Sequence, residues 1–128
     1  MTTLIDPDDK TEDLLKKWAS LEPDKCRYDE EYGEWRVVYH SVEDHVHYAG
    51  RLDHARIQGA VQQCVESRGW LWRIYHAQNR HRRFKPVPGR YTGQVDKPGV
   101  EFSAQATNAV DSLLTAYIMA LDHESVKR

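Results

Sequence analysis

The chain has 128 residues, of which 40% are hydrophobic, and its net charge is −2. This length and composition predict one packed domain, residues 1–128, with frayed tails at 1–10 and 122–128, and they exclude a disordered chain. Two cysteines are too few for a disulfide framework, and no apolar run suggests a membrane span or a signal peptide, so we expect a cytoplasmic protein that contacts no membrane.

The charges are unevenly distributed along the chain. Residues 1–35 contain eleven acids and five bases, whereas residues 67–95 contain seven bases and no acid. Such an asymmetry bears on the partners of a protein rather than on its fold. The basic region is therefore the first place to look for a binding site.

The N-terminal third predicts one helix. Asp6-Pro7 suits a helix start, Leu14, Leu15 and Trp18 form an apolar stripe, and Pro23 ends the helix. The polar and acidic residues 24–34 are predicted to form a loop or connector.

A first hairpin is predicted next. Residues 34–40 alternate as a strand with Trp35, Val37 and Tyr39 on one face, residues 41–44 form a turn, and residues 45–48 return as an antiparallel partner. A helix capped by Asp53 follows and ends at Gly69. Its core stripe consists of Ile57, Ala60, Val61, Cys64 and Val65.

The central strand is predicted over residues 69–76. Alternation places Trp70, Trp72 and Ile74 on a core face and Leu71, Arg73 and Tyr75 on the opposite face. The basic run 78–85 follows this strand directly.

Two further strands and a helix complete the chain. Residues 91–95 are predicted as an edge strand, 96–99 as a turn and 100–104 as a last strand. Thr107 or Asn108 caps the final helix, whose apolar face consists of Val110, Leu113, Leu114, Tyr117, Ile118 and Leu121. These elements predict an α+β fold in which a small, mainly antiparallel sheet is layered between helices.

The basic hairpin is the main candidate site. Arginines bind phosphates in bidentate fashion, and aromatic side chains among them can stack on bases. The predicted ligand-binding residues are Arg73, Arg80, Arg82, Arg83, Phe84, Lys85, Arg90 and Tyr91. Two alternatives stay open: a solvated edge strand whose charge prevents aggregation, and pairing of these bases with the acidic N-terminal segment.

A second candidate is a metal site. His40, His45, His47 and His54 lie within fifteen residues, and Asp44 or Asp53 could complete the ligands. The chain has no HExxH, Gly-x-Ser-x-Gly or phosphate-binding Gly-rich loop, and Cys64, the conceivable nucleophile, lies on a core stripe. A metal-dependent hydrolase is thus the minority hypothesis, and no cofactor is expected.

Packing motifs between residues 45 and 121 resemble those of a known family. They are Tyr48-Ala49-Gly50-Arg51-Leu52-Asp53-His54-Ala55, Ala60-Val61, Gly69-Trp70-Leu71-Trp72, and Phe102-Ser103-Ala104-Gln105-Ala106-Thr107 leading to Ala109, Leu113-Leu114 and Ala120-Leu121. This pattern resembles the phage ABA sandwich domain of tailed-phage and prophage proteins. The basic run and residues 86–89 are longer than that pattern, and the acidic N-terminal quarter has no counterpart. The resemblance implies a helix–sheet–helix fold and a phage origin, hence the host cytoplasm, but no activity.

Together these observations favour a non-catalytic phage accessory protein. We expect it to bind an anionic ligand, such as a nucleotide, a signalling nucleotide or a nucleic acid, in host takeover or counter-defence. One alternative is a structural protein that binds a host protein or forms a homo-oligomer through its apolar helix face or an edge strand. The other is the metal hydrolase that uses His40, His45 and His47.

Overall fold

The computed structural model describes residues 10–48, 51–76 and 91–126, which form three helices and eight strands. The helices are α1 (Thr11–Leu21), α2 (His54–Ser67) and α3 (Ala109–Val126). The strands are β1 (Cys26–Asp29), β2 (Glu34–Tyr39), β3 (Val42–His45), β4 (His47–Tyr48), β5 (Arg51–Leu52), β6 (Leu71–His76), β7 (Tyr91–Lys97) and β8 (Val100–Ala106). No helix in this part of the chain is long and apolar enough to cross a membrane.

The α+β fold is confirmed, and all of the strand pairs are antiparallel. The strands do not form the single sheet that we expected. Within the described ranges they are divided between a β1-β2-β3 sheet, a β4-β5 hairpin and a β6-β7-β8 sheet.

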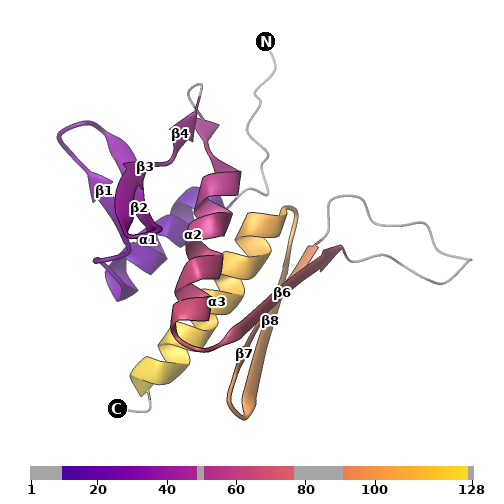
Figure 1. Ribbon diagram of the computed structural model, residues 1–128. Helices are drawn as coiled ribbons and strands as arrows, with labels where there is room; N and C mark the ends of the chain where they lie inside the picture. The colour runs from indigo at the N-terminus through magenta and orange to yellow at the C-terminus, as the bar shows by residue number, and fades with distance from the viewer. Residues whose placement is uncertain (1–9, 49–50, 77–90, 127–128) are drawn as a thin grey trace, which may run out of the picture.

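Helix α3 occupies the middle of the molecule (Figure 1). It packs against the β6–β8 sheet on one side and against α1 and α2 on the other, while α1 and α2 contact the β1–β3 sheet. The layers therefore run from a sheet through α3 and the helix pair to a second sheet. No described helix covers the outer face of the β6–β8 sheet, which is the face turned away from α3.

Two neighbouring layers explain why α3 is the most apolar helix. All six residues of its predicted apolar face are buried, with at most 6% of each exposed.

Asn108 accepts a 2.8 Å hydrogen bond from the backbone N–H of Asp111 and is the N-cap. Residues 122–126 were expected to belong to a frayed tail, but they are helical, because α3 continues to Val126. Lys97 stabilises this last stretch through a 2.9 Å ion pair with Glu124.

The central strand has the predicted faces. Trp70 is buried and Trp72 and Ile74 pack against the core, whereas Leu71 and Tyr75 on the opposite face are 67% and 49% exposed. The core stripe of α2 is buried as expected, and the Asp53 carboxylate caps this helix by accepting the Arg56 N–H. The α1 stripe is confirmed at Leu15 and Trp18, but the Asp6-Pro7 start lies outside the described residues.

The predicted edge strand at residues 91–95 is wrong in its position and its length. It belongs to β7, which extends to Lys97 and lies in the centre of its sheet between β6 and β8. Thr92 and Gln94 suggested a solvated edge because they are polar, yet they are only 8% and 6% exposed. Gly93 between them faces α3, so alternation directs both side chains to the other face of the sheet.

The predicted connector at residues 24–34 is also wrong, because it contains β1, which pairs with β2. The Asp29 carboxylate accepts hydrogen bonds from the N–H groups of Glu31 and Tyr32, and Gly33 has a φ of +64°, so the turn chemistry was present in the sequence. The next turn is tighter than the expected 41–44. It is centred on His40 and Ser41, which both have positive φ.

Gly93 allows β7 to lie directly against α3. A Cβ at this position would overlap the backbone of Ser112 and Leu113, which cannot move as a flexible side chain can. We expect Gly93→Ala to lower the free energy of unfolding by about 3 kcal/mol because of this overpacking. Gly99→Ala is the control: its Cβ meets no atom within 4 Å, and its φ of +81° costs about 1 kcal/mol. If urea unfolding shows the same loss of stability for Gly93→Ala and Gly99→Ala, the close approach of β7 to α3 is contradicted.

Candidate functional site

The outer face of the β6–β8 sheet presents three rows of side chains across its strands. The register gives the rows Leu71–Asp96–Glu101, Arg73–Gln94–Ser103 and Tyr75–Thr92–Gln105. The first row lies near the β7–β8 turn, and the third lies toward the end where β6 stops and β7 begins. The face is thus mostly polar: β6 contributes an exposed tyrosine and an exposed arginine, whereas Thr92 and Gln94 in the middle strand are buried.

Charge on this face is graded from one end to the other. Asp96 and Glu101 stand directly opposite each other in the first row, so this end is acidic. The Arg73 side chain is 62% exposed, and its 3.9 Å contact with Asp96 is long and solvated. Such an exposed pair contributes little, so Arg73 keeps most of its capacity to bind another anion.

The opposite end of the sheet leads into the basic run. His76 ends β6 and pairs in register with Tyr91 at the start of β7, and their rings lie 4.9 Å apart. Of the predicted ligand-binding residues, the structure therefore places Arg73 on the outer face, whereas Tyr91 alternates with Thr92 and lies on the face that packs against α3. The other predicted residues, Arg80, Arg82, Arg83, Phe84, Lys85 and Arg90, lie outside the described residues.

The histidines of the metal hypothesis are engaged separately. His40 lies 3.0 Å from the Gln63 amide of α2, the His45 Nδ1 accepts the N–H of His47 at 3.4 Å, and the His47 Nε2 accepts the Trp35 N–H at 3.0 Å. A neutral imidazole has only one nitrogen with a lone pair, and a metal ion would bind it there. In His45 and His47 this lone pair accepts a backbone N–H instead. The described residues contain no group of three or more metal-binding side chains.

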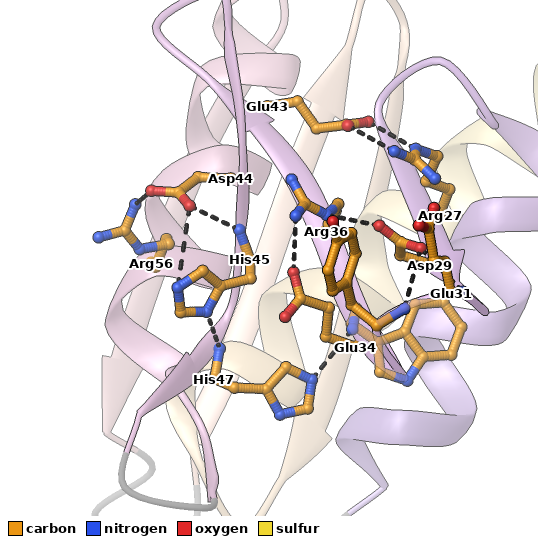
Figure 2. Close-up of polar contacts among 12 residues, drawn as sticks. Arg27, Asp29, Glu31, Glu34, Arg36, Glu43, Asp44, His45, His47 and Arg56 are labelled. Carbon is orange, nitrogen blue, oxygen red and sulfur yellow. Dashed lines mark hydrogen bonds and ion pairs between the residues drawn. The ribbon is translucent and has the colours of Figure 1, made fainter.

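Figure 2 shows the ion pairs and hydrogen bonds of the β1–β3 sheet. Arg27 of β1 donates to both carboxylate oxygens of Glu43 on β3, at 2.8 and 2.7 Å. Arg36 of β2 lies between Asp29 and Glu34, at 3.1 and 2.8 Å. Of the acidic segment, Asp29 and Glu34 are thus paired within their own sheet, while the basic run lies outside the described residues.

One acid does reach the basic region. Glu22, next to α1, is 8% exposed and accepts hydrogen bonds from Trp18 at 3.0 Å, Tyr117 at 2.7 Å and Arg68 at 2.6 Å. Burial alone would raise the pKa of Glu22, but the hydrogen bonds from Arg68, Tyr117 and Trp18 outweigh it and lower this pKa. The carboxylate joins all three helices, so it has a structural role.

Sequence reasoning missed a second buried cluster. The Asp111 carboxylate of α3 accepts the Thr11 hydroxyl at 2.5 Å and the Lys10 N–H at 2.9 Å, and the Thr11 oxygen lies 3.2 Å from the His54 Nε2. Threonine, histidine and aspartate can form a hydrolytic site, but Thr11 is fully buried and donates to the acid. The cluster fastens the N-termini of the three helices together.

The two cysteines are free and buried. Burial is the main cause that raises the pKa of Cys26 to about 12 and that of Cys64 to about 11. A thiol with such a pKa stays protonated near neutral pH, and the thiolate is the nucleophilic form. The structure therefore gives Cys64 no catalytic activation.

We expect Glu22→Gln to lower the free energy of unfolding at neutral pH by about 2 kcal/mol, because charge-assisted hydrogen bonds are lost. The pKa of Glu22 is lower in the folded state than its ordinary value of 4.5. Its contribution is therefore complete above that value and disappears as the pH falls through the folded-state pKa. Urea unfolding should show the stabilities of wild type and variant converging as the pH falls below the folded-state pKa of Glu22. Exposed Glu30→Gln is the control, and a difference that is independent of pH would contradict the ionised network.

Thiol labelling tests the burial of the cysteines. A disulfide reagent at mildly alkaline pH should leave both thiols of the folded protein unmodified, because they are protonated and covered. Both should react once the protein is unfolded in urea. Rapid labelling of Cys64 in the folded protein would show instead that this thiol is accessible.

Comparison of the chain with protein-family models, curated proteins and solved structures finds no match. The resemblance to the phage ABA sandwich domain therefore stays a prediction, and the functional argument rests on the geometry of this chain.

Proposed function

We propose that the protein is a non-catalytic binding module that takes single-stranded nucleic acid onto the outer face of its β6–β8 sheet. The observation that carries this proposal is the exposed pair Arg73 and Tyr75 on β6. Their rows contain only uncharged polar partners, namely Gln94 and Ser103 beside Arg73, and Thr92 and Gln105 beside Tyr75.

These side chains match the chemistry of a nucleic-acid strand. An exposed tyrosine offers a ring on which a base can stack, and arginine supplies a forked donor for phosphate. The exposed hydroxyl of Ser103 and amide of Gln105 on β8 can form hydrogen bonds with the edges of unpaired bases, whereas Thr92 and Gln94 between them and β6 are buried. The outer face of a sheet suits an extended polymer better than a single nucleotide, because proteins usually enclose a single nucleotide in a cleft.

The basic segment 77–90 is joined to the end of this sheet that lies next to Tyr75. Residues 77–90 leave the sheet at His76 and return at Tyr91, and their sequence contains five bases and no acid. Long-range attraction by such a segment raises the rate at which a polyanion encounters the adjoining surface. A phage origin, as the resemblance implies, would place this binding in host takeover or counter-defence.

Paired substitutions test the sheet face. We expect Tyr75→Ala to weaken binding of a fluorescent single-stranded oligonucleotide about tenfold, because one stacked base is worth about 1–3 kcal/mol. Arg73→Ala should make the salt dependence shallower by about 0.7 in the slope of log K against log salt. The matched controls are Tyr32→Ala, which removes an exposed tyrosine of the β1–β2 turn, and Arg51→Ala, which removes an exposed arginine.

The same assay tests the basic run. Replacing Arg80, Arg82 and Arg83 with Glu should abolish binding while the unfolding transition is unchanged. A mononucleotide that competes as well as the oligonucleotide would assign the site to a nucleotide instead. If oligonucleotide affinity is unaffected by all of these changes, the proposed function is wrong.

A further inference from the structure

Strand β8 is the last strand of its sheet in the described part of the chain, so one side of its backbone has no strand partner there. Proteins usually protect such an edge with lysine, proline or a bulge, because an open edge recruits further strands. β8 has seven residues, none of them lysine or proline, and it pairs with β7 along its whole length without a bulge. The edge is therefore regular and suited to pairing.

We propose that β8 pairs antiparallel with β8 of a second copy of this chain, across a two-fold axis at Ser103. This is the only in-register arrangement that pairs all seven residues, because it matches Val100 with Ala106 at the two ends. The two three-stranded sheets then become one six-stranded sheet. The inference does not depend on ligand binding.

The sequence of β8 is self-complementary in this register. Glu101, its only charged residue, faces Gln105 of the partner, so the two glutamates are kept apart. On the inner face Phe102 lies opposite Ala104, so that a large side chain meets a small one. Directly opposite pairs are the ones that stabilise or destabilise a sheet, and none of these pairs is repulsive.

Helix α3 provides a second contact on the same flank. The Phe102 ring of β8 lies 5.3 Å from the ring of His123, and Met119 precedes His123 by one helical turn. Met119 is therefore on the β8 side of α3, and at 40% exposure it is the only exposed large hydrophobic residue described on the three helices. A sheet extended beyond β8 brings a second chain next to this side chain. The opposite edge strand, β6, contacts α2.

Site-specific cross-linking tests the register. Opposed residues in antiparallel strands have Cα atoms about 4.5–5.5 Å apart, which suits a disulfide. Ser103→Cys should thus form an interchain disulfide under mild oxidation, whereas Glu101→Cys should not, because its two copies would lie about 14 Å apart. A mixture of Glu101→Cys and Gln105→Cys chains should cross-link to each other. The native cysteines are buried and contribute little background.

A charge reversal tests the interface without cysteine. Gln105→Glu places two acids opposite each other and should shift the chain toward monomer in sedimentation equilibrium, while Glu101→Lys combined with Gln105→Glu should restore the dimer. Met119→Glu should also weaken the dimer. Unfolding curves of each variant confirm that the fold is intact. A wild-type monomer at the highest soluble concentration overturns the proposal, and so does a dimer in which Glu101→Cys cross-links as fast as Ser103→Cys.

Discussion

The fold depends on the burial of α3 from two sides at once. The helix has a sheet on one face and two helices on the other, so nearly every turn of it contributes to the core. This requirement explains the glycine in β7, since a helix can approach a strand this closely only where no side chain intervenes. It also explains why the polar residues that α3 does bury are hydrogen-bonded.

Two of these polar contacts fix the orientation of α1. Thr11, its first residue, donates to Asp111 near the start of α3, and Glu22, just after its end, accepts from Tyr117 further along. All three helices thus begin at one end of the molecule, which is the end where residues 77–90 leave the sheet. Helix N-termini carry partial positive charge, so the helices and the basic segment contribute potential of the same sign there.

The elements with a strong local pattern were predictable from the sequence. The faces of β6, the core stripe of α2 and the apolar face of α3 follow from their periodicity alone. The central position of β7 was not predictable, because its polar residues Thr92 and Gln94 are buried and strand order is a non-local property. The clusters around Asp111 and Glu22 join residues about a hundred positions apart, a pairing that no local pattern encodes. For the candidate site, alternation predicted the exposed face of β6, but only the register with β7 and β8 shows which side chains share its rows.

The attachment of α1 to α3 also has a consequence for biosynthesis. The chain emerges from the ribosome N-terminus first, and domains form as their parts become available. Leu15 and Trp18 are fully buried in the finished protein, yet the helix that carries Asp111 and Tyr117 is synthesised after all of the other described elements. A nascent chain therefore holds this apolar surface uncovered until α3 has been synthesised. A message truncated before α3 would yield a product with exposed apolar residues, suited to capture by chaperones or proteases.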